Sequence, residues 1–223
     1  MPLLIRMEQH KTKPMPELDD NALNHPEIPE VIATRKDAVS GVGFRKRFIH
    51  LLQILRKQGL RLTLLESSEQ IMRLTSGAPR RRYSQITPHL HVGGQHSERG
   101  LAILQKRGIT AVVSMRGELD DREQGISPER YLYVPTVDNH APTLEQLKTG
   151  VNFIRAEIEK GGGVYIHCWE GVGRAPTMAA AYLVSTGLSP KEAWERICHV
   201  RPFIRPVVSQ LEQIERFAAL RRE

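Results

Sequence analysis

The sequence predicts an α/β fold, with a central and mostly parallel sheet flanked by helices and a basic helical extension ahead of it. Three observations support this fold class. Apolar segments of strand length alternate with helical patterns, turn glycines separate them, and 223 residues suffice for one well-filled core. Ligands of such sheets bind beyond the carboxyl ends of the strands. We divide the chain into a loosely ordered tail (1–40), a basic helical extension (41–82) and an α/β domain (83–223).

The tail and the extension differ in composition. Residues 1–40 are rich in Pro, Asn, Asp, Glu and His, which is typical of a loosely ordered segment. A helical pattern begins at Phe44, breaks at Gly59 and resumes to Thr75, and 76–82 has the composition of a linker. Between residues 41 and 82 there are ten Lys or Arg and two Glu, which more than accounts for the net charge of +7. Such a segment suits an anionic membrane or an acidic partner, or a solvated helix face; nucleic acid is not expected as a partner.

The elements of the α/β domain follow in order. Strands are expected at 89–94, 109–115, 131–137 and 161–167, and helices at 97–108, 143–158, 174–186, 189–200 and around 211–217. Two helix starts are marked by capping boxes, Thr143 with Gln146 and Ser189 with Glu192. The strand that ends at His167 runs directly into a cysteine, which places Cys168 at the ligand-binding edge of the sheet.

Cysteine usage and the lack of long apolar runs indicate the compartment. The two cysteines, Cys168 and Cys198, provide no disulfide framework, which favours a reducing setting. The first residues lack the apolar core of a signal peptide, and no run has the length and apolarity of a bilayer span. We therefore expect a cytoplasmic protein, with peripheral membrane attachment as an alternative. Cys198 is expected to be a buried small hydrophobe, and the alternative is a redox partner for Cys168.

The chemistry is concentrated in HCWEGVGR, residues 167–174. Gly171 and Gly173 allow successive backbone amides to point into one concavity, and the helix that starts near Arg174 adds the positive end of its dipole. The planar fork of Arg174 can grip two phosphate oxygens at once. The same positive field favours the thiolate of Cys168. The cradle that holds a phosphate group therefore also activates a nucleophile, with His167 orienting the loop from behind.

His-Cys, five residues and Arg form the signature of the protein tyrosine phosphatase superfamily, and the chain from Tyr83 onward resembles its compact dual-specificity branch. The resemblance implies phosphomonoester hydrolysis in two steps through a phosphocysteine at Cys168, with no cofactor. The nine histidines are scattered and predict no metal cluster. The resemblance further implies that Arg174 binds phosphate together with the loop residues Trp169, Glu170, Gly171, Val172 and Gly173.

The family also uses an Asp on a loop to protonate the leaving oxygen. Asp138 stands thirty residues before Cys168, after a strand and before a helix, where the resemblance places this acid. Asp120 and Asp121 are alternatives, although their segment, RGELDDRE, has the composition of a solvated loop. Gln210 lies in a segment that resembles the pocket-closing region of some relatives. It is a candidate for positioning water, and the alternative is a helix-surface glutamine.

Two positions depart from the family pattern. Ala175 stands where most relatives carry Ser or Thr, whose hydroxyl stabilises the departing cysteine; losing one such hydrogen bond costs about 1.5–3 kcal/mol and slows turnover. Glu170 stands where inositide phosphatases place lysine, which disfavours highly phosphorylated lipids. The favoured substrate is therefore a phosphoprotein, phosphorylated on Tyr or on Ser/Thr. The alternatives are a phosphorylated lipid, sugar or other small molecule, and a pseudophosphatase that binds phosphate without turnover.

Overall fold

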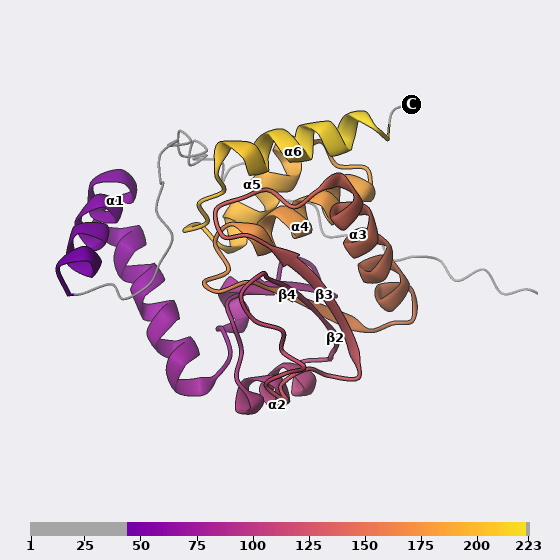
Figure 1. Cartoon of the computed structure of the whole chain (residues 1–223), viewed down its shortest axis with the longest axis horizontal. Helices are drawn as coiled ribbons and strands as arrows, with labels where there is room; N and C mark the ends of the chain where they lie inside the picture. Colours follow the sequence, from indigo (N-terminus) through magenta and orange to yellow (C-terminus); the bar gives the residue numbers. More distant parts are fainter. Residues whose placement is uncertain (1–43, 222–223) are drawn as a thin grey trace, which may run out of the picture.

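The computed structural model describes residues 44–221, with side chains from residue 59 onward, so the tail predicted for 1–40 lies outside it. Four strands form one parallel sheet in the order β1-β4-β2-β3 (Figure 1). Their bounds are β1 Leu90–Gly93, β2 Ile109–Arg116, β3 Arg130–Thr136 and β4 Gly163–His167. The predicted α/β class, the four strands and their parallel arrangement are confirmed.

Helices cover both faces of the sheet. On one face lie α3 (Leu144–Glu159), α4 (Arg174–Ser185), α5 (Pro190–Val200) and α6 (Val208–Ala219), and on the other lies α2 (Glu98–Lys106) (Figure 1). β4 is buried along its whole length, because side chains on both of its faces meet helices. Ile166 belongs to the larger core beneath α3 to α6, whereas Tyr165 belongs to the smaller core beside α2. Both predicted capping boxes are present, at Ser189 and Thr143.

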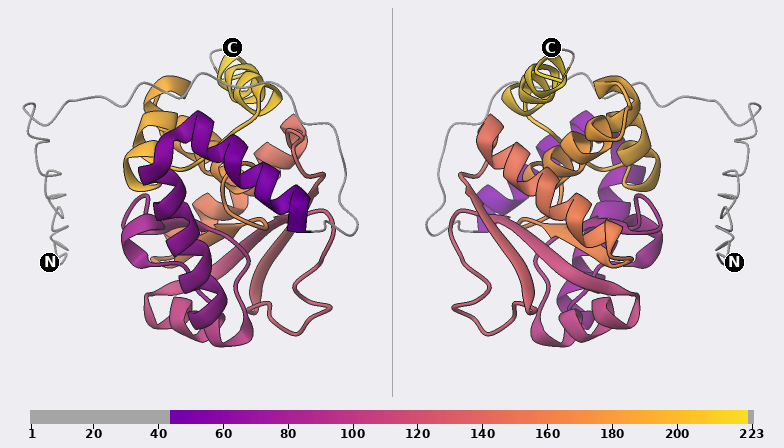
Figure 2. Two further views of the ribbon diagram at one scale, coloured as in Figure 1. Left: turned by 90° about the vertical axis from the view of Figure 1, so that its left-hand side faces the viewer. Right: turned by 90° about the vertical axis from the view of Figure 1, so that its right-hand side faces the viewer.

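The helix α1 (Phe44–Ser76) bends at Gly59, where φ is 76°, and Figure 2 shows its two segments at an angle. The predicted break at Gly59 is confirmed. The linker predicted for 76–82 is wrong, because Gly77, Ala78 and Pro79 are buried. A Cβ on Gly77 would lie 2.1 Å from Ser97 Oγ, so this turn packs closely against the start of α2. Among the described helices, none is both long enough and apolar enough to cross a membrane.

Two buried histidines are expected to make the fold sensitive to mild acid. His91 and His96 are 1% and 2% exposed, and burial, aided by neighbouring cationic groups, lowers the pKa of each to about 4. The unfolded chain takes up these protons near pH 6.5, whereas the folded chain resists them until about pH 4. The unfolded state then binds more protons, so the free energy of unfolding falls as the pH drops through this window. The loss is up to about 1.4 kcal/mol per pH unit for each histidine.

Urea unfolding between pH 7 and pH 4 measures this dependence. His91→Gln is expected to make it shallower. The control is His199→Gln, at an exposed histidine of α5 that is not among the groups acting on His91, and it should leave the dependence unaltered. The same steepness in wild type and His91→Gln would contradict the assignment to His91.

Candidate active site

The cysteine loop, residues 168–173, joins β4 to α4 at the carboxyl edge of the sheet. Cys168 is 3% exposed, and the backbone amide of Gly171 donates a hydrogen bond to its Sγ at 3.3 Å. Gly171 has a φ of 75°, and a Cβ there would lie 2.2 Å from the carbonyl carbon of Gly93. Only glycine fits this position, and the left-handed backbone conformation of Gly171 turns its amide toward the sulfur.

Two arginines from the segment after α5 fix the outer side of the cysteine loop. Arg201 Nε donates to Gly171 O at 2.6 Å, and its Nη2 donates to Glu170 O at 2.9 Å. The backbone amide of Arg205 donates to Val172 O at 2.7 Å. Because three successive carbonyls are held outward, the amides of the loop are left to face the opposite way, toward Cys168. This segment was expected to close the pocket, and the structure shows that it also shapes the loop.

Arg174 begins α4 and is almost fully buried, at 2% exposure. Its Nη1 lies 2.9 Å from Glu118 Oε2 and donates to Thr136 O at 2.9 Å, while its Nη2 lies 3.0 Å from Asp138 Oδ1. Burial alone would lower the pKa of Arg174, but the Glu118 hydrogen bond and nearby negative charge raise it. Burial would likewise raise the pKa of Glu118, but Arg174 holds it at about 2. Among the described residues, Arg174 Nε has no hydrogen-bond partner.

Asp138 lies just beyond β3, and its side chain is 68% exposed, so it reaches Arg174 from the solvent side. Asn139 adopts a left-handed φ of 59°, and His140 Nδ1 lies 2.9 Å from Asp138 O, which together form a tight turn. Gln210 is only 1% exposed, and its Nε2 donates to His140 O at 3.0 Å. The structure therefore brings Asp138 to the cysteine loop. Gln210 is therefore a buried residue that connects α6 to this turn by a hydrogen bond, and not a helix-surface residue.

Asp121 occupies a different place from the one its sequence suggests. The segment RGELDDRE was expected to be a solvated loop, yet Asp121 is 0% exposed and its Oδ2 lies 2.7 Å from His167 Nε2. Burial would raise the pKa of Asp121, but the hydrogen bond and charge of His167, helped by Gln95, lower it. The prediction for this segment is wrong at Asp121, because a histidine far along the chain draws the carboxylate inside. Asp121 thereby fixes the side chain of His167 from the side opposite the cysteine loop.

One group of side chains has the composition of a cation site. His96, Asp121 and His167 each place a possible ligand atom within 4.8 Å of the others, all buried. Two contacts already use atoms that would have to bind a metal ion. Asp121 Oδ2 and His167 Nε2 bind each other, and His96 Nε2 lies 2.9 Å from Ile126 O. We interpret Asp121 and His167 as a hydrogen-bonded pair beneath the cysteine loop, with the ring of His96 packed edge-on against that of His167 at 5.0 Å between ring centres.

The remaining loop residues line the rim of the site. Trp169 is 47% exposed, with the guanidinium of Arg116 4.7 Å and that of Arg73 5.4 Å from its ring centre. Because it is exposed and faces these two cations, Trp169 forms an aromatic surface at the rim of the site. Glu170 points away from the loop toward Arg205, at 3.5 Å.

The comparisons with known proteins point to one family. Residues 91–188 match the family model "Polymorphic toxin system, DSP-PTPase phosphatase". Over this region the chain is similar to the DSP-PTPase phosphatase family. Its members are cysteine-dependent phosphatases, and Cys168 with the cysteine loop lies inside the matched region.

Relatives agree with this assignment. Human dual specificity protein phosphatase 1 is 28% identical over 135 residues, covering 60% of this chain and 36% of that protein. Human protein phosphatase Slingshot homolog 3 is 32% identical over 142 residues, covering 62% of this chain and 21% of that protein. The chain thus spans well under half the length of these curated relatives. Among solved structures, PTPMT1 in complex with PI(5)P is 28% identical with a TM-score of 0.57, covering 62% of this chain and 96% of that one. Tk-PTP in its active form is 27% identical with a TM-score of 0.56, covering 63% and 98%.

Ala175, which stands where most relatives carry a hydroxyl, is fully buried in the first turn of α4. The nearby hydroxyl of Thr177 donates to Gly173 O at 2.9 Å and so does not replace the missing one. Burial raises the pKa of Cys198 to about 11, which keeps that half-buried cysteine a neutral thiol at physiological pH.

Sequence reasoning missed Glu118, Gln95 and the two loop-holding arginines. A usable signal existed for Glu118 and Gln95, because each follows the carboxyl end of a parallel strand, where sites of α/β proteins are built. The segment that contains Arg201 and Arg205 was expected at the pocket, but no local pattern assigns these two side chains to the cysteine loop, whose residues lie about 30 positions earlier in the chain.

Proposed function

We propose that this chain hydrolyses phosphomonoesters through a phosphocysteine at Cys168. The observation that carries the proposal is the amide hydrogen bond to Cys168 Sγ inside a loop whose carbonyls are held outward. Such a loop stabilises both a thiolate and the oxygens of a phosphate group. Arg174 Nε adds a buried donor beside them, and Nη1 is already fixed by Glu118 and Thr136 O, which orients the fork in advance.

The reaction follows from these positions. The thiolate of Cys168 attacks phosphorus, a sulfur–phosphorus bond forms, and the bond from phosphorus to the ester oxygen breaks. Asp138, in its protonated form, gives its proton to the departing oxygen. Water then attacks phosphorus, Asp138 takes a proton from it, the sulfur–phosphorus bond breaks, and inorganic phosphate leaves with the thiolate restored. We assign binding of the phosphate oxygens to Arg174 and the amides of residues 169–173, and support of the loop to His167 and Gln210.

We propose a phosphoprotein as the substrate. Trp169 is exposed beside the site and can pack against a peptide or an aromatic ring, and Glu170 offers no positive charge to a second phosphate group. A phosphorylated lipid is the second candidate, because the related PTPMT1 has been solved in complex with PI(5)P.

Parallel assays of phosphotyrosine peptides, phosphoserine/threonine peptides, a phosphoinositide and a phosphosugar test this order, with Cys168→Ser as the blank. Highest kcat/KM on peptides supports the proposal. Highest kcat/KM on the lipid or sugar would reassign the substrate, and phosphate binding without any turnover would indicate a pseudophosphatase.

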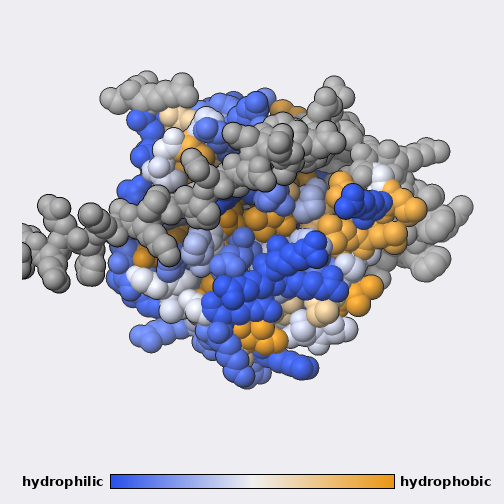
Figure 3. Space-filling view, turned by 180° about the vertical axis from the view of Figure 1, so that it is seen from behind, coloured by the Kyte–Doolittle hydropathy of each residue, from blue (hydrophilic) through white to orange (hydrophobic). Residues whose placement is uncertain are grey.

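An exposed face of α1 supports membrane attachment of a cytoplasmic enzyme. Four large apolar residues with exposures of 61–70% recur at helical spacing: Leu60, Leu64, Ile71 and Leu74. Figure 3, turned by 180° from Figure 1, shows apolar surface toward its right-hand side, which corresponds to the left-hand side of Figure 1, where α1 lies. The surplus of Lys and Arg in 41–82 would repel a second copy but attract anionic lipid, so we propose an anionic bilayer as the partner of this face.

Sedimentation with lipid vesicles tests this attachment. Wild type is expected to sediment with phosphatidylserine-containing vesicles and less with neutral ones, and Leu64→Glu combined with Ile71→Glu should abolish the difference. Leu220→Glu, at an exposed apolar residue of the C-terminal region, is the control. Equal binding by wild type and the double variant would reject the bilayer as partner.

A further inference from the structure

Gln95, two residues beyond β1, uses all of its polar groups and is only 9% exposed. Its backbone amide donates to Trp169 O at 3.0 Å, and its carbonyl accepts from Arg73 Nη1 at 2.9 Å. Its side-chain Nε2 donates to Asp121 Oδ1 at 3.0 Å, and its Oε1 accepts from Arg116 Nη1 at 3.0 Å. One residue therefore contacts α1, the cysteine loop, and two segments that hold charged groups of the site.

The contacts of Gln95 continue to both ends of the signature motif. On one side, Asp121 binds His167, the residue before the nucleophile. On the other side, Arg116 Nε donates to Glu118 Oε1 at 3.0 Å, and Glu118 binds Arg174. The resulting chain of hydrogen bonds and ion pairs runs through His167, Asp121, Gln95, Arg116, Glu118 and Arg174. Because His167 and Arg174 also flank the cysteine loop, this chain closes a polar ring around it.

We infer that Gln95 is a positioning residue for the phosphatase reaction, an inference that rests on the proposed function. Its amide accepts from a cation and donates to an anion at the same time, which neither a carboxylate nor an apolar side chain can do. Loss of either bond leaves a buried charged group of the ring with one partner fewer. The orientation of His167 and of Arg174 therefore depends on the amide of Gln95.

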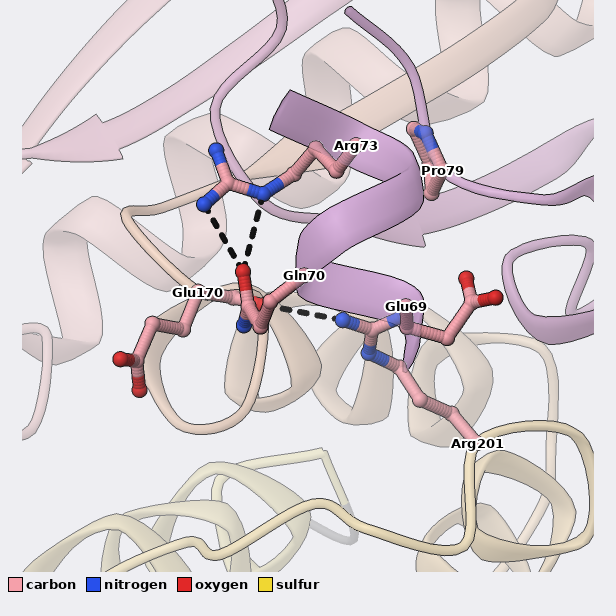
Figure 4. A pocket seen from close by; sticks show the side chains of 6 residues that line it. All are labelled: Glu69, Gln70, Arg73, Pro79, Glu170 and Arg201. Atoms are coloured by element: carbon pink, nitrogen blue, oxygen red, sulfur yellow. Dashed lines mark hydrogen bonds between the residues drawn. The ribbon is translucent and has the colours of Figure 1, made fainter. Parts of the chain in front are cut away.

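The same residue connects α1 to the site. The side chain of Arg73 is held by Gln70 of the same helix and reaches Gln95 O, and its guanidinium lies over Trp169. Figure 4 shows Glu69, Gln70 and Arg73 of α1 close to Glu170 and Arg201, on the outer side of the cysteine loop. The second segment of α1 thus lines the outer side of the site, so residues that precede the α/β domain contribute to it.

Gln95→Glu tests the inference, because it keeps the size of the side chain and removes the donor to Asp121. The groups that face it are Arg73 from α1, Arg116 from the end of β2, Asp121, and the neighbouring His96. With para-nitrophenyl phosphate at pH 7, we expect kcat to fall about tenfold or more and the inhibition constant of inorganic phosphate to rise. The loss relative to wild type should shrink as the pH is lowered, because the protonated side chain can again donate to Asp121.

The matched control is Gln105→Glu, an exposed position on α2, which should stay within about twofold of wild type at every pH. If Gln95→Glu does not fold, as judged by circular dichroism, Arg116→Met removes the bond to Gln95 Oε1. It should lower kcat without the recovery in acid.

A folded Gln95→Glu whose activity matches wild type, or whose loss is the same at all pH values, would overturn the inference but not the proposed function. Unchanged kcat in Arg116→Met would likewise overturn the inference. An inactive wild-type protein would overturn the proposed function and the inference with it.

Discussion

Cys168→Ser is expected to lower phosphatase turnover by on the order of 10⁴-fold or more, to the level of a buffer blank. A serine hydroxyl in this loop is not ionised at neutral pH, so no nucleophile remains to form the covalent intermediate. The cradle itself survives, because Arg174 and the loop amides are held by Glu118, Arg201 and Arg205 and not by the sulfur. The variant should therefore still bind inorganic phosphate or a phosphopeptide, which isothermal titration calorimetry can measure.

Cys198→Ser is the control for this experiment. Cys198 is a half-buried neutral thiol on α5, and its replacement should leave kcat/KM close to wild type. A Cys168→Ser protein with a tenth of the wild-type rate would show that another group attacks phosphorus. Equal losses in both variants would show that Cys198 is itself needed for activity. A wild-type enzyme that recovers from peroxide with a reductant when Cys198→Ser does not would support the redox partnership raised by the sequence.

Asp138→Asn is expected to lower kcat by about 10²–10⁴-fold on substrates with a poor leaving group. An alkoxide such as that of serine needs the proton that Asp138 supplies, whereas para-nitrophenolate departs readily without one. The loss should therefore be much larger for a phosphoserine peptide than for para-nitrophenyl phosphate. The basic limb of the pH–rate profile, which reports the protonated acid, should disappear as well. Steady-state kinetics on both substrates between pH 5 and pH 8 measure these effects.

The alternative acids provide the controls. Asp120→Asn changes a carboxylate that binds Arg122 away from the site, and it should alter neither the profile nor the leaving-group dependence. Asp121→Asn removes the charge that holds His167 and should slow both substrates by similar factors. If the loss in Asp138→Asn were the same for both leaving groups, the role of acid would pass to another residue.

Local patterns were sufficient to predict the fold and the glycine-containing loop that holds Cys168. β4 and the cysteine loop are encoded within a dozen residues, since an apolar run, glycines and an arginine at the helix start each act on their neighbours. Asp138 was predicted through the family resemblance, which expects an acid on a loop between a strand and a helix. The residues that support the site could not be predicted from local patterns, because Gln95, Glu118 and Arg205 contact partners far away in the sequence.

Asp121 shows why composition alone misled. Four of the eight residues of RGELDDRE are acidic and two are basic, which predicts a solvated loop. The adjacent Asp120 agrees with that prediction in part, since it pairs with Arg122 near the surface. Asp121 does not, because His167 and Gln95 supply buried partners that only the folded sheet brings to it. The same reason applies to α1: its contact with the cysteine loop depends on Arg73, which the charge pattern presented as one cation among ten.

Trapping the intermediate tests the central proposal most directly. Because Ala175 supplies no hydroxyl to the departing sulfur, breakdown of a phosphocysteine should be slow enough for it to accumulate. We expect acid quench during turnover, followed by mass spectrometry, to find one added phosphoryl group on the peptide that contains Cys168. Cys168→Ser should show none. Turnover of wild type without any phosphoryl group on Cys168, or with the group on another residue, would contradict the proposed mechanism.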